Sequence, residues 1–178
     1  FGSIVGALAE CGYGWAYRIL DLRSFGIPQR RERLFIVGHI SDPRPAIRAL
    51  LERTPTKEDC GSACKVEQGN MARTTGRTID GWSGDETPKR GEGVCPTLRA
   101  NQGGEGVGVI EGPGRLRKLM TVEWERLQGF PDSYTRVVYG KGMATKRQRE
   151  RALGNAFPPP MLRWIGKGIA AEENRTSL

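Results

Sequence analysis

Two apolar runs separated by a short turn constrain the first part of the chain more than any other feature. The runs are WAYRILDL (15–22) and RLFIVGHI (33–40), and they have the alternation or the β-branched content that is typical of strands. Gly26 and Pro28, which lie between the two runs, are common turn residues. The sequence therefore predicts two adjacent strands that form a hairpin at the edge of a sheet.

A helix is predicted before this hairpin. Four side chains recur at three- and four-residue spacing and end at Gly12: Ile4, Val5, Leu8 and Cys11. One helix and one hairpin cannot bury much apolar surface. Residues 1–40 are therefore expected to complete a larger sheet.

The rest of the chain divides into two regions of different composition. Residues 41–114 begin with proline breaks and one short helical stretch, and they continue with many glycines and the strand-like runs VCPTLRA and GVGVI. Loops and short strands are expected there, and disorder is the alternative. Residues 115–178 are expected to be helical, with Thr121 as an N-cap and Gly129 as a stop.

The last helix is expected to follow three consecutive prolines. Its apolar stripe would contain Leu162, Ile165 and Ile169. Gly154 and Asn155, just ahead of the prolines, are expected to form a tight loop.

Basic charge is concentrated at the C-terminal end. The net charge is +8, and residues 115–178 contain thirteen basic and six acidic residues, a balance of +7. This excess favours a nucleic-acid partner, although a solvated helix surface would also account for much of it.

No apolar run approaches the roughly 20 residues that span a bilayer, so a membrane protein is not expected. Because the first residue is Phe1, we expect the sequence to be a cut from a longer chain.

No complete catalytic motif is present in the sequence. It contains no G-x-x-x-x-G-K phosphate loop, no G-x-S-x-G elbow and no H-E-x-x-H pair. The four cysteines are scattered and are expected to be reduced thiols. Cys60 and Cys64 lack a second ligand pair, so no metal site is predicted.

An arginine cluster offers the most specific chemistry. On a strand, Arg31 and Arg33 are two residues apart and are expected to point the same way, and Gln29 would share their face. Two guanidinium groups on one face suit a phosphate or the oxygen of a base edge, because each presents planar, permanent donors. A charged sheet edge that prevents unwanted strand pairing is the alternative.

Three segments together resemble a known family. FGIPQRRERLFIVG (25–38), RKLMTVEWERLQGFPDSY (117–134) and ALGNAFPPPMLRWIGKGI (152–169) resemble, in order, the three C-terminal motifs of DNA methyltransferases that modify carbon-5 of cytosine. Residues 41–114 match the position of the family's target-recognition region, and PTLRA (96–100) resembles its Thr-Leu dipeptide.

This resemblance implies an α/β fold and a division into three parts. The chain would be the C-terminal part of a Rossmann-like, S-adenosylmethionine-dependent methyltransferase with a small, loop-rich target-recognition domain. Residues 1–40 would end the catalytic domain, 41–114 would form the target-recognition region, and 115–178 would be helices that return to the catalytic domain.

The resemblance also implies roles for individual residues. Arg33 would reach a cytosine flipped out of the duplex, Arg31 would support the base or a neighbouring phosphate, and Gln29 would shape the same pocket. Asn155 and Ala156 would close the S-adenosylmethionine pocket.

Further roles fall on the recognition region and on the segment that follows it. Thr97 and Leu98, with Arg99 beside them, would lie at the DNA face. A scaffold that holds the recognition region against the catalytic domain would include Arg117, Glu123 and Arg126.

Other family motifs are missing. The glycine motif for the cofactor, the Pro-Cys nucleophile and the Glu-Asn-Val motif all precede the motif that opens this chain, and Cys95 stands before Pro96 in the reverse of the nucleophile's order. The expected partners are therefore double-stranded DNA and an N-terminal half or complementary subunit, in the cytoplasm of a bacterium or of a phage's bacterial host. A DNA-binding remnant without catalytic activity is the alternative.

Overall fold

The predicted hairpin is present in the computed structural model, which describes residues 1–60, 78–80, 89–90, 95, 98, 108–111 and 115–176. Strands β1 (Tyr13–Asp21) and β2 (Glu32–Ile40) pair antiparallel along their whole length, with Ile19 opposite Leu34. A 3-10 turn (Leu22–Phe25) follows β1 and ends at Gly26, whose φ of 80° is left-handed. Glycine adopts this conformation without the strain that a Cβ would cause, which explains the turn there. Helix α1 (Gly2–Glu10) precedes β1, as predicted.

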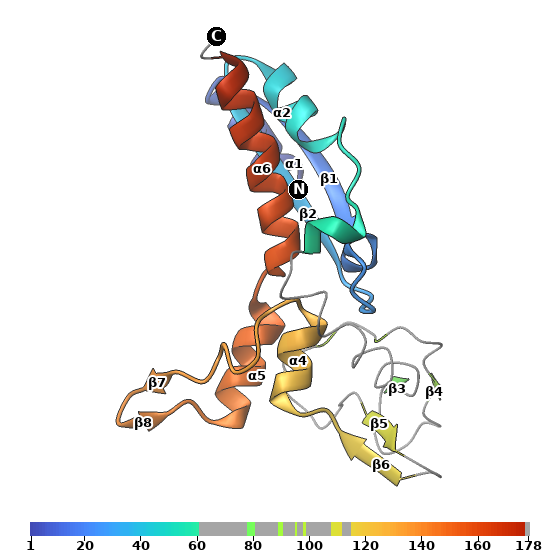
Figure 1. Cartoon of the computed structure of the whole chain (residues 1–178). Coiled ribbons are helices and arrows are strands. Elements are labelled where there is room, and N and C mark those ends of the chain that lie inside the picture. The colour runs from blue at the N-terminus through green and yellow to red at the C-terminus, as the bar shows by residue number, and fades with distance from the viewer. Residues whose placement is uncertain are drawn as a thin grey trace.

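Two helices cover one face of the hairpin. Helix α2 (Pro43–Leu50) packs against β1, β2 and α6 (Pro159–Thr176), and Figure 1 shows the long α6 lying along the hairpin. Trp164 of α6 is 1% exposed and meets the ring of Phe25 edge-on. The guanidinium groups of Arg18 and Arg53 lie over the same indole ring. The core is therefore formed by elements from both ends of the chain.

The second half of the structure lies beyond the N-terminal end of α6 (Figure 1). Helices α4 (Thr121–Leu127) and α5 (Lys146–Asn155) contact each other, and the small hairpin of β7 (Val138–Tyr139) and β8 (Gly142–Met143) joins them. A four-stranded sheet has the order β4-β3-β5-β6, with bounds Lys89–Arg90, Thr78–Asp80, Gly108–Glu111 and Arg115–Lys118. A short 3-10 turn, Lys57–Cys60, contacts α6.

Several expectations about the helices need correction. The N-cap of α4 is Met120, and Thr121 is already helical. Gly154 and Asn155 end α5 instead of forming a loop. On α6, Ile165 is buried as expected, but Leu162 and Ile169 are 48% and 38% exposed. The other buried positions are Pro160, Met161, Trp164, Gly168 and Glu172. The stripe is displaced because α6 packs on both the hairpin turn and α2, so its buried face is wider than a single apolar row.

The oxidation state of the cysteines differs in part from the expectation. Cys60 is disulfide-bonded, so reduced thiols were a wrong expectation for that residue, whereas Cys11 and Cys95 are free.

Helix α2 lies within residues 41–114 but packs on the hairpin and on α6. The three-part division of the chain stays a prediction, and this packing indicates a later start for the second part. Within the described residues, no helix is long and apolar enough to cross a membrane.

Candidate functional site

The segment between the 3-10 turn and β2 is tied by its backbone to Cys95, within the residues expected to recognise DNA. The amide of Arg30 donates to the carbonyl of Cys95 at 2.7 Å, and the amide of Cys95 donates to the carbonyl of Pro28 at 2.8 Å. Cys95 is fully buried. Two positions about 65 residues apart in sequence are therefore held together like a short parallel β-bridge.

Arg31 links three of the segments that the sequence singled out. Its side chain is 1% exposed, and Nη2 donates to the carbonyls of Gly154 (3.0 Å) and Ala156 (2.7 Å). Nη1 makes a longer contact of 3.5 Å with the carbonyl of Leu98. Burial, with a smaller contribution from the nearby charge of Arg33, lowers the pKa of Arg31 to about 10, so the group remains charged at neutral pH. Carbonyl oxygens thus solvate a buried cation.

Arg33 has different surroundings. It lies within β2 opposite Leu20, is partly exposed, and donates from Nη1 to the carbonyl of Glu32 at 2.8 Å. The expectation that Arg31 and Arg33 act side by side is therefore corrected in part. Arg31 precedes the strand and is used inside the protein, whereas the guanidinium of Arg33 retains donors for a ligand.

Gln29 is buried, and its side chain has no hydrogen-bond partner among the described residues. Its side chain is fully buried, and neither Oε1 nor Nε2 forms a hydrogen bond with any described residue. An amide left in this state costs free energy, and such groups mark positions where a ligand or another segment supplies the bond. This amide lies two residues from Arg31, and the place of Gln29 at a binding pocket stays a prediction.

The two residues expected at the cofactor differ in what they can offer. Asn155 is the last residue of α5; its side chain is exposed and lines an open hollow of about 610 Å³. The amide of Ala156 donates to Leu153, and its carbonyl accepts from Arg31, so its backbone groups are already bonded. Phe157 then contacts Phe35 of β2, with ring centroids 5.7 Å apart. This segment is therefore fixed to the arginine segment by two separate contacts.

Of the residues expected at the DNA face, only Leu98 is described. Leu98 is 1% exposed and its side chain belongs to the hydrophobic core; its place at the DNA face stays a prediction. Its structural role is to bring a carbonyl to Arg31. Thr97 and Arg99 lie outside the described residues.

The expected scaffold residues form ion pairs around α4. Arg117 donates from both terminal nitrogens to Glu123, which also accepts from the amide of Met120 at 2.7 Å. Although burial opposes ionisation, these hydrogen bonds lower the pKa of Glu123. Arg126 pairs with Asp132.

Sequence reasoning missed two buried polar residues of α4 and its C-terminal end. Glu125 is fully buried, which opposes ionisation, but it accepts from Ser133, Thr135 and Arg149, and these bonds together keep its pKa below the usual value. The side-chain amide of Gln128 is fully buried and has no partner among the described residues. Both residues look like ordinary polar positions in a surface helix, and only Gly129 and Pro131, which follow them, indicate that the chain turns back over them.

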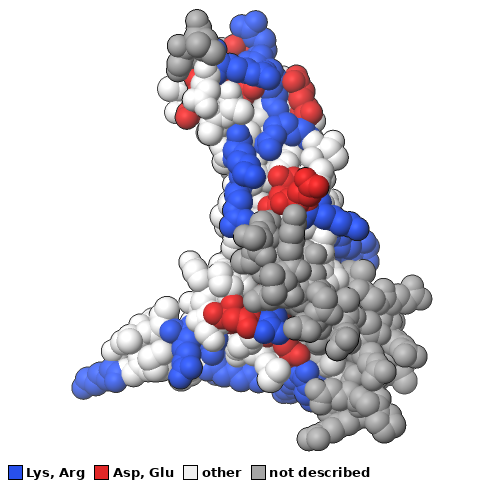
Figure 2. Space-filling model, viewed as in Figure 1, with Lys and Arg blue, Asp and Glu red and all other residues white. Residues whose placement is uncertain are grey.

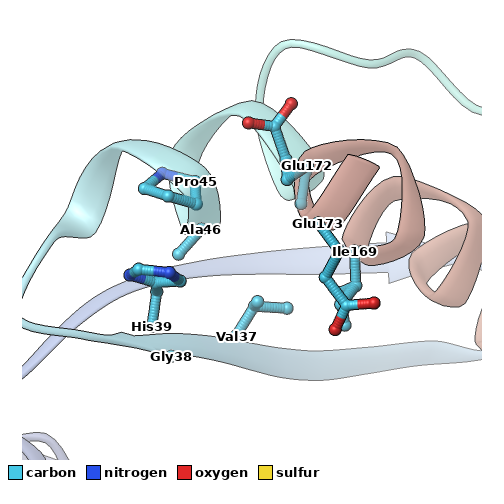
Figure 3. Close-up of a pocket in the computed structure, with 9 residues that line it drawn as sticks. Val37, Gly38, His39, Pro45, Ala46, Ile169, Glu172 and Glu173 are labelled. Carbon is cyan, nitrogen blue, oxygen red and sulfur yellow. The ribbon is translucent and has the colours of Figure 1, made fainter. Parts of the chain in front are cut away.

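A second hollow of about 360 Å³ lies between β2, α2 and α6 (Figure 3). Its apolar lining includes Val37 from β2, Ala46 from α2 and Ile169 from α6. His39 and Glu173 also line it. Glu172 at its edge is paired with Arg48. None of the residues predicted to be functional lies in this hollow.

Solved structures identify the class of fold. The chain is similar to the crystal structure of the S. pombe Dnmt2 methyltransferase, with a TM-score of 0.59 at 15% identity over 97% of this chain and 62% of that one. It is also similar to the Entamoeba histolytica methyltransferase EhMeth, with a TM-score of 0.57 over 97% of this chain and 58% of that one. The fold is therefore the α/β fold of S-adenosylmethionine-dependent methyltransferases, as predicted.

Sequence comparison defines the family within this class. The C-5 cytosine-specific DNA methylase family matches residues 1–68 and 52–171. The chain belongs to this family.

The curated relatives that the chain matches are Type II methyltransferases. The Type II methyltransferase M2.BsuMI of Bacillus subtilis is 28% identical over 98% of this chain and 44% of its own length. M.NlaX of Neisseria lactamica is 31% identical over 94% of this chain and 56% of its own length. The chain thus spans about half the length of the curated relatives it matches.

Proposed function

We propose that this chain supplies the base-holding and target-recognising part of a DNA (cytosine-5) methyltransferase. The complete enzyme would transfer a methyl group from S-adenosylmethionine to carbon-5 of cytosine within a specific DNA sequence. The observation that carries the proposal is the position of Arg31, which is bonded to the carbonyls of Gly154, Ala156 and Leu98. One buried cation thereby joins the arginine segment, the recognition region and the segment expected at the cofactor.

Arg33 is proposed to hold the flipped cytosine. A base that leaves the duplex needs rigid donors at its edge, and Arg33 is held on a paired strand with free donors. A positive charge there would stabilise the negative charge that develops on the carbonyl oxygen at carbon-2 of cytosine as the ring is attacked. Arg31 would act as a positioning residue for Arg33, and the unpaired amide of Gln29 would bond to the base or to the segment that covers it.

Asn155 is proposed to contact S-adenosylmethionine, which would supply the methyl group as an electrophile. The exposed amide of Asn155 offers a donor and an acceptor, and these suit the polar amino-acid part of the cofactor. Because the polar backbone atoms of Ala156 are already bonded, it can add only a methyl contact. The residues that are present therefore fit one side of a cofactor site.

The proposed partners follow from what the chain contains and what its relatives add. Double-stranded DNA would contact the recognition region within residues 41–114. A further segment of the enzyme, comparable to the other half of the relatives, would supply the cysteine nucleophile and most of the cofactor site. This proposal leaves the sequence specificity to residues of the recognition region.

Methyl transfer in a mixture tests the proposal. Labelled S-adenosylmethionine and mixed-sequence DNA are incubated with this chain alone, with a separately expressed N-terminal half of a relative such as M2.BsuMI, and with both. We expect transfer only in the mixture and its loss in the variant Arg33→Ala. Transfer by this chain alone, or an unchanged rate in Arg33→Ala, would contradict the proposal. Sequence-selective DNA binding without transfer in any mixture would instead support a non-catalytic remnant.

A further inference from the structure

The small hairpin between α4 and α5 projects from the rest of the molecule. Figure 1 shows β7 and β8 extending away from both helices, with their turn at the far end. The turn contains Gly140, whose φ is 65°, and a Cβ at that position would meet no atom within 4 Å. Val138 and Tyr139 are 75% and 65% exposed. The turn of the hairpin therefore lies in open space.

Basic side chains gather on this hairpin and on the following helix. Residues 133–151 contain six basic residues and one acidic residue, a balance of +5. Lys146 lies near Glu150, and Arg149 pairs with Glu125. The other four have no acidic partner in the part of the chain that the structure describes: Arg136, Lys141, Arg147 and Arg151. Figure 2 shows basic side chains at the tip and along the base of the projection.

Several arginines elsewhere on the described surface pair with nearby carboxylates. Arg23 pairs with Asp21, Arg44 pairs with Asp42, and Arg126 pairs with Asp132. Exposed cations without a carboxylate partner among the described residues, such as Lys57 and Lys167, also occur elsewhere, but four of them lie within residues 136–151, and this clustering needs an explanation.

The base of the projection is rigid. Arg149 donates to the buried carboxylate of Glu125 and to the hydroxyl of Thr135, so the two ends of the hairpin segment are joined. Thr145 caps α5, and the amide of Thr145 donates to the side chain of Gln148. Charges that are held on a rigid support lose little entropy when they bind a partner.

We propose that the β7–β8 hairpin and the adjoining exposed face of α5 bind the phosphate backbone of duplex DNA outside the recognition sequence. We call this the basic hairpin surface; it comprises Arg136, Lys141, Arg147 and Arg151. Regularly spaced phosphates match several unpaired cations, and such contacts add affinity without reading bases. The exposed side chains of Val138 and Tyr139 at the tip would contact sugars beside the phosphates. This inference rests on the proposed function for the identity of the polyanion.

Salt-dependent binding tests the inference. A fluorescent duplex of about 30 base pairs with mixed sequence is titrated with the chain at several salt concentrations. The variant is Lys141→Gln/Arg147→Gln. The matched control is Lys57→Gln/Lys167→Gln, which removes two exposed cations that are also without a carboxylate partner among the described residues. Thermal unfolding of each protein verifies that the fold is retained.

The two double variants are expected to differ clearly. Because the hairpin variant removes two cations that would each neutralise a phosphate, the slope of log K against log salt should fall in magnitude by about 2, and affinity near 0.1 M salt should fall about tenfold or more. The control should keep the slope of the unmodified chain. Equal slopes in the hairpin variant and the control would overturn the inference, as would a slope unchanged from the original chain.

Methyl transfer in the mixture separates this inference from the proposed function. At saturating DNA the hairpin variant should transfer methyl groups at the original rate, whereas Arg33→Ala should lose transfer and retain the salt slope. A mixture without transfer, but with the slope reduced only in the hairpin variant, would remove the proposed function and leave the DNA contact standing. Normal transfer in the mixture, with an unchanged salt slope in the hairpin variant, would leave the proposed function standing and remove the DNA contact at the basic hairpin surface.

Discussion

Arg31 and Arg33 are two residues apart but have opposite surroundings. Arg31 is 1% exposed and bonded to three carbonyl oxygens, whereas Arg33 is partly exposed and bonded to one. A guanidinium that satisfies buried carbonyls contributes to folding, and one that retains free donors contributes to binding. The same residue type therefore has a structural role at one position and a proposed catalytic role at the other.

Lysine substitutions should separate these roles. A lysine at position 31 keeps the charge but cannot reach the carbonyls of both Gly154 and Ala156, so Arg31→Lys should lower the free energy of unfolding by about 2 kcal/mol. Arg33→Lys should change it by less than about 0.5 kcal/mol, yet reduce methyl transfer in the mixture. Urea unfolding and labelled transfer measure the two effects. Equal stability of the two variants would contradict the assignment.

Glu125 leads to a prediction about pH. Although burial opposes its ionisation, its hydrogen bonds hold its pKa below the ordinary value of 4.5, so the folded state binds this proton less readily than the unfolded state. The stabilisation is therefore present above about pH 4.5 and is lost as pH falls through the lower folded pKa. Glu125→Gln should reduce the free energy of unfolding by about 2 kcal/mol at pH 7 and by less near pH 3.5. Urea unfolding at both pH values measures this, and a constant difference would contradict it.

At the scale of elements, one glycine allows α6 to approach α2. A Cβ on Gly168 would lie 2.5 Å from the carbonyl oxygen of Ala49 and 2.6 Å from Arg53, whereas one on Gly166 would meet nothing within 4 Å. Gly168→Ala should therefore force the helices apart and lower the free energy of unfolding by about 2 kcal/mol. Gly166→Ala should raise it by up to about 1 kcal/mol, because alanine favours helix. Thermal unfolding compares the pair, and a similar shift in both would contradict the packing argument.

Elements were predictable from sequence where local residues determine them. Gly26, Pro28 and the alternation of the two runs were enough to predict β1 and β2. The side-chain directions at Arg31 and Leu98 were not, because the partners of Arg31 lie 67 to 125 residues away and no local pattern encodes such contacts. The predicted burial of Leu162 on α6 was wrong for the same reason. Its burial depends on which neighbouring elements cover the helix.

At the scale of the whole molecule, the outer face of the β1–β2 hairpin is apolar and exposed. Tyr17, Ile19 and Leu34 are 47%, 60% and 41% exposed, and Ile19 lies directly opposite Leu34. Phe1 meets Tyr17 edge-on and is itself 57% exposed. Contiguous apolar surface of this kind marks a contact site. Since the relatives contain about as much chain again, we expect a further segment of the enzyme to cover this face.

This expectation predicts how the isolated chain behaves in solution. With the face uncovered, the chain should self-associate in sedimentation experiments, and Ile19→Glu/Leu34→Lys should make it monomeric, since the new cross-strand pair replaces two apolar groups by opposite charges. The same variant should no longer support methyl transfer in the mixture, because the charges oppose docking of the added half. Leu51→Glu, an equally exposed leucine after α2, should leave both properties unchanged. A double variant that still supports transfer would show that the N-terminal half docks elsewhere.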